Sequence, residues 1–301
     1  MEVIPIAFDS LGTRSMSCFV ATNDVNILID PGVSLAPIRY NKPPHSIELK
    51  RLEEHKREII KYSEKSDILT ISHMHFDHFM PESKEIYKNK ILLIKHPTQN
   101  INRSQFGRAK EFLELINYTP KQIEYADNRE FIFGKTKIKF SPPCWHGAEK
   151  SKLGYVLMVS IDDGDTKIMH CSDVQGPVVS KTTELIIREN PDLIIISGPL
   201  SYMVGFRLSW QNLKQAENNF IRILREAKAE TIILDHHLLR DLDYKNKFKN
   251  AYAEAEKLNK KVISAAEFLG KPIEMLEARR KELYQKYPEV ESGKKLKILE
   301  E

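Results

Sequence analysis

Residues 67–78 read DILTISHMHFDH, and this stretch decides the fold that we expect. Its first part is a nearly continuous apolar run, which is typical of a β-strand covered on both faces. Its second part brings His73, His75, Asp77 and His78 close together along the chain. Alternate residues of an extended chain point to the same side, so His73 and His75 can share one partner. The stretch therefore predicts a buried strand that ends in a metal site.

The side chains of this motif are of the types that bind divalent cations in proteins. Imidazole nitrogen and carboxylate oxygen suit zinc first, with iron or manganese as alternatives. We expect His73 and His75 to bind one cation, and a turn after them to let Asp77 and His78 face a second. Two cations about 3.5–4 Å apart can clamp a displacement reaction. A solvated histidine-rich turn is the simpler interpretation, but the position directly after a buried strand argues against it.

These residues resemble the HxHxDH signature of the metallo-β-lactamase superfamily, and the likeness extends over about residues 1–270. The resemblance implies an α/β fold, a four-layered αβ/βα sandwich of mixed sheets with outer helices. It also implies that the metals lie at one edge, between the two sheets. The chain looks closest to an archaeal branch of predicted hydrolases.

The further ligands that this resemblance implies follow later strands in the expected order. His146 matches the third histidine of the first metal, Asp173 the carboxylate that both metals share, and His236 the last histidine of the second metal. His237 is the alternative to His236, because adjacent residues at a strand end point opposite ways and only one should bind. Asp30 matches an aspartate that supports the site through hydrogen bonds.

Two residues are expected to act on the substrate, and three to line its pocket. Asp77 is expected to accept or orient the water proton as well as bind the second metal, and His237 or Tyr202 to donate a proton to the leaving group. Trp145 lies beside a predicted ligand, and Ser197 and Tyr202 lie in a loop after an apolar strand, where α/β proteins often carry function. Ordinary core packing of Trp145 and an ordinary turn at the loop are the alternatives.

Strand-rich and helical segments alternate twice, which is typical of sheets with helices outside. We expect one domain over 1–270 with a helical insertion at 34–66, and a C-terminal helical extension with a charged tail over 271–301. His170 lies inside an expected strand and is interpreted as structural or supporting. The expected strands are 3–8, 17–21, 25–29, 67–72, 91–95, 131–133, 136–141, 155–161, 167–171, 193–196 and 231–234. The expected helices are 47–65, 105–118, 213–228, 244–258 and 274–287.

The composition restricts the partners and the compartment. The net charge is only +4, from 46 basic and 42 acidic residues, which gives no strong argument for nucleic acid and leaves it a possible partner beside a small molecule. Three irregularly spaced cysteines form no disulfide framework, which favours a reducing cytoplasm. The sequence contains no signal peptide and no apolar run that could span a membrane, so we expect a cytoplasmic protein. A homo-oligomer is left open.

The resemblance implies a hydrolase in which a hydroxide bridges two divalent cations. A small ester, lactone, thioester or cyclic phosphate is the favoured substrate, because superfamily nucleases usually carry an added nucleic-acid domain and none is apparent. The first alternative is a phosphodiesterase or nuclease that acts on RNA or DNA. The second is a metal-stabilised binding scaffold without activity.

Overall fold

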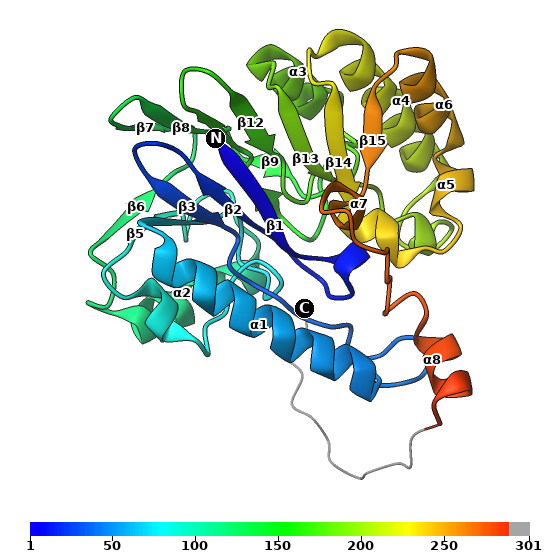
Figure 1. Cartoon of the computed structure of the whole chain (residues 1–301), viewed down its shortest axis with the longest axis horizontal. Helices are drawn as coiled ribbons and strands as arrows, with labels where there is room; N and C mark the ends of the chain where they lie inside the picture. Colours follow the sequence, from blue (N-terminus) through cyan, green and yellow to red (C-terminus); the bar gives the residue numbers. More distant parts are fainter. Residues whose placement is uncertain (289–301) are drawn as a thin grey trace.

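The computed structural model describes residues 1–288, which fold into two β-sheets packed face to face between helices (Figure 1). Helices α1 and α2 cover the first sheet, and α3, α4 and α6 cover the second. The fold is the predicted αβ/βα sandwich. Of the expected C-terminal extension and charged tail over 271–301, residues 289–301 lie outside the described part of the chain. No helix within residues 1–288 is long and apolar enough to cross a bilayer.

The first sheet has six strands in the order β1-β2-β3-β4-β5-β6. Strands β1 to β3 are antiparallel neighbours, whereas β3 to β6 are parallel neighbours that need crossover connections. Helix α1 connects β3 to β4, and α2 connects β5 to β6. The bounds are β1 (Glu2–Phe8), β2 (Met16–Ala21), β3 (Asn26–Ile29), α1 (Ser46–Lys65), β4 (Ile68–Ile71), β5 (Ile91–Ile94), α2 (Arg103–Ile116) and β6 (Gln122–Tyr125).

The second sheet has seven strands in the order β15-β14-β13-β12-β11-β8-β7, and β9 and β10 form a separate ribbon. Strands β12 to β15 are parallel, with α3, α4 and the α5–α6 pair as their crossovers. The strands are β7 (Glu130–Phe133), β8 (Thr136–Phe140), β9 (Cys144–Trp145), β10 (Tyr155–Val156), β11 (Val159–Asp162), β12 (Lys167–His170), β13 (Leu193–Ser197), β14 (Thr231–Asp235) and β15 (Lys261–Ile263). The helices are α3 (Ser180–Glu189), α4 (Trp210–Glu226), α5 (Tyr244–Lys247), α6 (Lys249–Lys257), α7 (Ala265–Phe268) and α8 (Arg280–Lys286).

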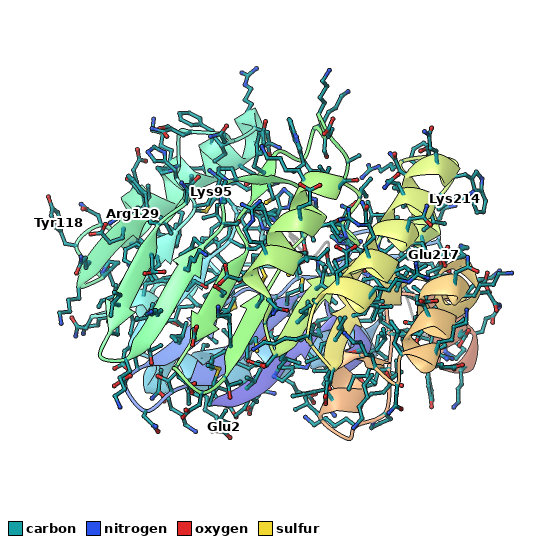
Figure 2. The ribbon with its side chains drawn as sticks, turned by 90° about the horizontal axis from the view of Figure 1, so that it is seen from above. Glu2, Lys95, Tyr118, Arg129, Lys214 and Glu217 are labelled. Atoms are coloured by element: carbon teal, nitrogen blue, oxygen red, sulfur yellow. The ribbon has the colours of Figure 1, made fainter. Side chains whose placement is uncertain are left out.

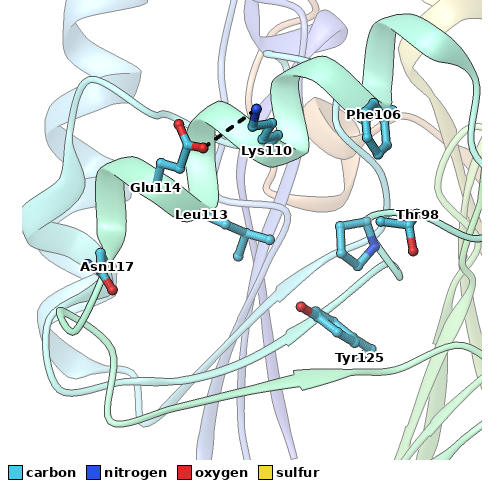
Figure 3. Close-up of a pocket in the computed structure, with 8 residues that line it drawn as sticks. Thr98, Phe106, Lys110, Leu113, Glu114, Asn117 and Tyr125 are labelled. Carbon is cyan, nitrogen blue, oxygen red and sulfur yellow. Dashed lines mark ion pairs between the residues drawn. The ribbon is translucent and has the colours of Figure 1, made fainter.

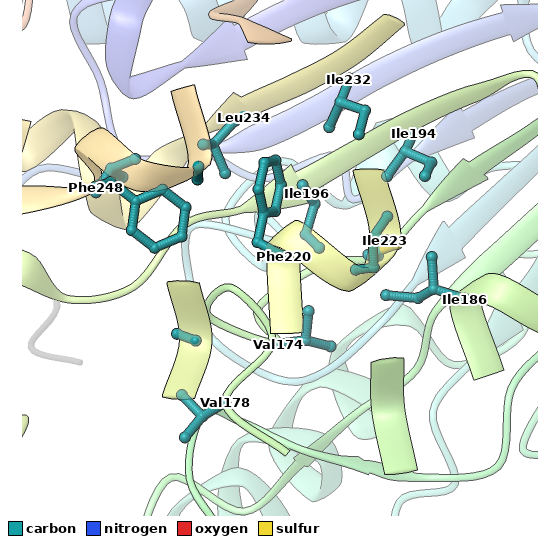
Figure 4. Close-up of a cluster of buried hydrophobic side chains, with 14 of the residues drawn as sticks. Val174, Val178, Ile186, Ile194, Ile196, Phe220, Ile223, Ile232, Leu234 and Phe248 are labelled. Atoms are coloured by element: carbon teal, nitrogen blue, oxygen red, sulfur yellow. The ribbon is translucent and has the colours of Figure 1, made fainter. Parts of the chain in front are cut away.

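Alternate residues of the central strands supply three apolar cores. In β4, Ile68 belongs to the core between the sheets, whereas Leu69 and Ile71 pack under α1 and α2. In β13, Ile195 faces the central core, and its neighbours pack beneath α4 against Phe220 (Figure 4). Figure 2 shows α3 and α4 lying across the second sheet from above, with Lys214 and Glu217 on α4. Each fully buried side chain of this kind contributes about 1.5–3 kcal/mol, so both sheets need their covering helices.

The expected strand 155–161 is two strands, β10 and β11. Between them, the N–H of Leu157 donates to the carbonyl of Ser72, 3.0 Å away, and the N–H of Met158 donates to Ser141 Oγ at the same distance. The chain therefore leaves the second sheet to bond the end of β4. The break joins the two sheets beside the HxHxDH motif.

Two expected helices are also shorter or interrupted. The helix 244–258 breaks at Phe248, where φ is −121° and ψ is 27°, into α5 and α6. Of the expected helix 274–287, only Arg280–Lys286 is helical. The N–H of Glu274 donates to the carbonyl of Ser10 at 2.9 Å. The contact with the 3₁₀ turn Asp9–Leu11, which follows β1, therefore replaces the first turn that the periodicity predicts.

Five short elements were not predicted: α3, α7, β6, β9 and β15. Strands β6 and β15 lie at sheet edges and carry charged residues, so their apolar alternation is weak. Helix α3 begins with Ser-Lys-Thr-Thr, and serine and threonine are poor helix formers. Tertiary packing therefore decides these elements more than local propensity does.

The segment 34–66 contains α1, the crossover that the parallel strands β3 and β4 require. The C-terminal residues pack on the start of this helix. Arg280 donates to Glu48 at 2.8 and 2.9 Å, and both side chains are fully buried. The ring of His45 also lies 2.9 Å from the carbonyl of Tyr287. The division of the chain at residue 270 stays a prediction.

Candidate metal centre

The seven predicted ligands come from four separate stretches of the chain and meet at one edge between the sheets. Their side chains are at most 7% exposed. Their ligand atoms fall into groups in which every atom lies within 4.8 Å of the others. The groups are His73, His75, His146 and Asp173; Asp77, His78 and His236; and Asp173, His236 and His237.

The first group has the spacing of ligands around one cation. Asp173 Oδ2 lies 3.1 Å from His146 Nε2 and 3.6 Å from His73 Nε2. His73 Nε2 lies 3.0 Å from His75 Nδ1. Four ligand atoms at zinc's bond lengths in a tetrahedron would be about 3.3 Å apart. These four residues could therefore hold one metal ion.

Asp173, a member of the first group, also lies close to the second. His236 Nε2 lies 3.3 Å from Asp173 Oδ1 and 3.5 Å from Asp77 Oδ2. His78 Nε2 lies 3.3 Å from Asp173 Oδ2 and 3.8 Å from Asp77 Oδ1. Asp173 thus stands between the groups, in the place of the shared carboxylate that the resemblance implies.

Unpartnered polar atoms test whether these residues fit metal ions. Asp77 Oδ1, His78 Nε2 and Asp173 Oδ1 are buried without a hydrogen-bond partner. A buried polar atom that lacks a partner costs about 1–3 kcal/mol, and more when it is charged. A pair of divalent cations would satisfy all three atoms. The donor set therefore fits the predicted cations, although metal binding itself stays a prediction.

The charge states of Asp173 and His73 agree with this fit, whereas those of two other predicted ligands do not. Against the effect of burial, Asp173 raises the pKa of His236 to about 9 and that of His78 well above its usual range, so these two rings would lose a proton when a cation binds. Burial would raise the pKa of Asp173, but His236, His78 and His237 outweigh it and lower that pKa well below its usual range. Burial lowers the pKa of His73 well below its usual range, helped by His78 and His75. Asp173 is therefore ionised and His73 neutral near neutral pH. Those are the forms that bind metal.

Asp30 occupies the supporting position that the resemblance implies. Its carboxylate accepts from the N–H and the hydroxyl of Ser72, at 2.7 and 2.6 Å, and bonds His78 Nδ1 at 2.8 Å. Ser72 Oγ also lies 3.0 Å from His73 Nδ1. One buried carboxylate thereby fixes the ring of one predicted ligand directly and that of another through a serine.

Asp9 supports the opposite side of the site and was missed in the sequence. Its Oδ2 lies 2.7 Å from His236 Nδ1, and its Oδ1 accepts from Arg240 Nε at 2.7 Å. Like Asp30, Asp9 directly follows an apolar strand. An aspartate directly after an apolar strand was the signal that could have marked Asp9 as a candidate site residue. Nothing in the sequence alone pairs the residue with His236, 227 positions away.

Both His236 and His237 face the site, which corrects the expectation that they point opposite ways. His236 has φ of 60° and begins a 3₁₀ turn (His236–Arg240), so strand alternation ends at Asp235. The Asp235 carboxylate accepts the N–H of His236 at 2.7 Å and holds this bend. His237 Nε2 lies 3.9 Å from Asp173 Oδ2, farther than His236. These distances favour His236 as the ligand.

The three predicted pocket residues differ in their surroundings. Ser197 is fully buried and accepts the N–H of Gln175 at 3.0 Å, so it lines no open pocket. Trp145 is half-buried and stacks on Tyr155, with ring centroids 4.1 Å apart. The ring of Tyr202 is half-buried beneath the Arg39 guanidinium, 4.3 Å away.

His170 bonds the carbonyl of Met16 at 2.9 Å, which fits its interpretation as a structural histidine.

Two surface hollows differ in their relation to the ligands. The larger, of about 640 Å³, lies between α2 and β6 and contains none of the predicted site residues (Figure 3). The smaller, of about 390 Å³, is lined by Ala148, Glu149, Val178, Val179, Ser180, Lys181, Asn212 and Gln215. Its lining includes Ala148, which follows shortly after His146 in the chain, but none of the predicted ligands.

Comparison with known proteins identifies the relatives of this chain. No family model matches it. The UPF0282 protein of Methanopyrus kandleri is 45% identical over 295 residues, covering 94% of this chain and 99% of the relative. That of Methanocaldococcus jannaschii is 47% identical over 296 residues, covering 95% and 97%.

Three solved structures share the fold at low sequence identity. The metallo-β-lactamase fold protein YhfI from Bacillus subtilis is 17% identical with a TM-score of 0.50, covering 87% of this chain and 95% of that one. An isothiocyanate hydrolase from Delia radicum gut bacteria is 14% identical with a TM-score of 0.51, covering 84% and 94%. Yeast PDE1 is 12% identical with a TM-score of 0.50, covering 87% and 95%. The chain belongs to the archaeal UPF0282 family and, as the HxHxDH motif predicted, has the metallo-β-lactamase fold.

Proposed function

We propose that this chain is a hydrolase that uses two divalent cations, zinc in the first instance, on a small ester, lactone, thioester or cyclic phosphate. The observation that carries the proposal is the meeting of seven ligand residues, three of which bear buried atoms without a partner. Bound divalent cations would lower the pKa of a water toward about 7 and polarise the substrate. His73, His75, His146 and Asp173 would hold one cation, and Asp77, His78, His236 and Asp173 the other.

The chain's own residues would orient the reaction around these ions. Asp30 and Asp9 fix the rings of His78 and His236. Asp77 carries a buried oxygen without a partner and can accept a water proton. His237 Nε2 lies 3.9 Å from Asp173 Oδ2, its buried Nδ1 has no hydrogen-bond partner, and the residue is the candidate donor to the leaving group. Removing His237 should therefore lower kcat and leave both cations bound.

A small substrate is favoured by the enclosure of the site. The ligands are nearly completely buried, and the hollow of about 390 Å³ that includes Ala148, close to His146 in the chain, has the size of a small-molecule site. Its lining includes Lys181, which could attract an anionic group, so a phosphodiester is the second substrate class to test.

A substrate panel with and without metal tests the proposal. The metal-free protein is loaded with Zn²⁺, Mn²⁺ or Fe²⁺ and assayed with p-nitrophenyl acetate, a lactone, a thioester and bis-p-nitrophenyl phosphate. Metal-dependent ester, lactone or thioester turnover, lost in His73→Ala and kept in His96→Ala, supports the proposal. His96 is the control because it belongs to none of the ligand groups.

The other results of this panel separate the alternatives. Cleavage of bis-p-nitrophenyl phosphate alone would move the substrate to phosphodiesters. Absence of all turnover with two equivalents of metal bound would contradict a hydrolase and favour the binding scaffold.

A further inference from the structure

Arg240 places a positive charge against the second ligand group. Its side chain is only 2% exposed, and its Nε donates to Asp9 Oδ1 at 2.7 Å. Its Nη2 lies 3.2 Å from His236 Nε2 and 3.6 Å from Asp77 Oδ2. These two atoms are also the ones that would face the second cation.

In the described part of the chain, no such contact with an arginine or lysine is found for three members of the first ligand group, Asp173, His73 and His146. Within residues 1–288, the ion-pair partners of Asp173 are all histidines. His73 and His146 likewise make no hydrogen bond or ion pair with a lysine or arginine in that range. Asp77, in the second group, has Arg240 as well as histidines around it. Arg240 therefore gives the second group a fixed positive charge that Asp173, His73 and His146 do not receive from a lysine or arginine within residues 1–288.

A cation at the second group would be repelled by the positive charge of Arg240. The guanidinium cannot lose its proton to remove this repulsion, because arginine stays charged in proteins. Asp9 raises the pKa of Arg240 further, although burial acts in the opposite direction. The guanidinium is also held in place, because Asp9 bonds Arg240 and His236 at once. Repulsion between like charges is strong in a buried, weakly screened site.

We infer that Arg240 makes the second cation site weaker than the first, so that the two cations bind one after the other. This inference rests on the proposed function, in which both groups hold divalent cations. Arg240 is then a positioning residue that acts on the occupancy of the second site. The simpler role is structural, since the Asp9 pair ties the end of β1 to the turn after β14.

The neighbouring pair of Arg14 and Glu277 provides a matched control. Arg14 Nε lies 2.6 Å from Glu277 Oε2, and both side chains are less than 10% exposed. This pair is buried like that of Asp9 and Arg240. Arg14 belongs to no ion pair with Asp77, Asp173 or a predicted histidine ligand. Loss of either arginine removes a buried cation, but only the loss of Arg240 should change the second site.

Equilibrium titration of the metal-free, full-length protein with Co²⁺, followed by visible absorption and calorimetry, tests the inference. Wild-type protein should bind two cations with Kd values at least tenfold apart, and His78→Ala should remove the weaker step. Arg240→Met should tighten the second step at least tenfold and change the first less than threefold. Arg240→Lys keeps the charge, and Arg14→Met keeps Arg240, so both should retain the wild-type separation within threefold.

Other outcomes of the Co²⁺ titration would overturn the inference. Two equal steps in the wild-type protein, or an unchanged second step in Arg240→Met, would overturn the inference and leave the proposed hydrolase standing. Weakening of both steps in Arg240→Met would assign the residue to packing and also overturn it. If the wild-type protein binds no Co²⁺ at all, the inference and the proposed function fail together.

Discussion

At the scale of single residues, the site depends on carboxylates that hold histidine rings as well as on the ligands themselves. Asp30 bonds His78 Nδ1, and Asp9 bonds His236 Nδ1, at 2.8 and 2.7 Å. Each bond turns the Nε2 atom of its histidine toward the other ligands, Asp77 and Asp173. The orientation of both rings is therefore set before a cation arrives.

Replacement of Asp30 by Asn should weaken metal binding by about 10- to 100-fold, because the bond that orients His78 loses its charged acceptor. Calorimetric titration of the metal-free protein with Zn²⁺ measures this change. Asp67→Asn is the control, since Asp67 is an exposed aspartate just before β4 that accepts the N–H of Asn26. Equal affinities in the two variants would mean that Asp30 does not orient the site.

Gly32 is needed because of a close backbone approach. A Cβ at this position would overlap the backbone of His78 and Phe79. Gly32→Ala should therefore lower the melting temperature by several degrees, since overpacking of this kind costs about 1–3 kcal/mol, and should deplete bound metal.

Gly107→Ala is the matched control for Gly32→Ala. Gly107 lies in α2, and a Cβ there would meet no atom within 4 Å. The substitution should stabilise the helix by about 0.5–1 kcal/mol, as an alanine does in a helix interior. If calorimetry finds the two variants equally stable, the proposed contact of Gly32 with the motif is wrong.

At the scale of elements, sequence periodicity predicted the strands that carry ligands better than it predicted the short elements between them. The apolar run before His73 was sufficient to predict β4. The runs before Asp173 and His236 were likewise sufficient to predict β12 and β14. The left-handed turn at His236 was not predictable, because it depends on bonds from Asp235 and Asp9. Edge strands such as β6 and β15 carry too few apolar residues to give a signal.

Helix α1 contains a histidine whose burial should make folding sensitive to acid. His55 Nδ1 lies 2.7 Å from Thr13 Oγ1, and burial, with Arg51 and Lys271 nearby, lowers the pKa of His55 to about 3. The unfolded chain takes up a proton below about 6.5, whereas the folded protein does so only near the lowered pKa. Stability from this residue is therefore present above about pH 6.5 and is lost as the pH falls toward 3.

His55→Asn removes this titration and should reduce the loss of unfolding free energy between pH 7.5 and 5 by about 2 kcal/mol. Urea unfolding of both proteins at the two pH values measures the difference. An identical pH dependence in wild type and variant would show that His55 is protonated without cost in the folded state.

At the scale of the whole molecule, the two sheets place ligands from distant parts of the sequence at one edge. The order of the ligands along the chain was predictable, because ligands follow strand ends and parallel strands end at a common edge. The place of Arg240 beside the site was not predictable, since its partner Asp9 lies near the other end of the chain. The pairing of first and last segments is a property of the folded sandwich, and only a structure reveals it.

The buried ion pair of Arg280 and Glu48 holds the C-terminal segment to the sandwich. Arg280 bonds both oxygens of Glu48 and also the carbonyls of Lys42 and Ala36. Arg280→Ala leaves a buried carboxylate unpaired and should cost about 3–5 kcal/mol of unfolding free energy.

The neighbouring Arg279 is the control for this substitution. Its side chain is half exposed and pairs with Glu282 on the same surface. Arg279→Ala should change the unfolding free energy by less than about 1 kcal/mol. Equal, small effects of both substitutions in chemical denaturation would show that the Arg280–Glu48 pair does not contribute to the stability of the sandwich.

Anomalous diffraction at the zinc edge, from crystals grown with Zn²⁺, tests the central claim most directly. We predict two peaks within about 2.0–2.3 Å of ligand atoms. One should be bound by His73, His75, His146 and Asp173, and the other by Asp77, His78, His236 and Asp173. Peaks at other residues, or no peak at this edge of the sheets, would contradict the account.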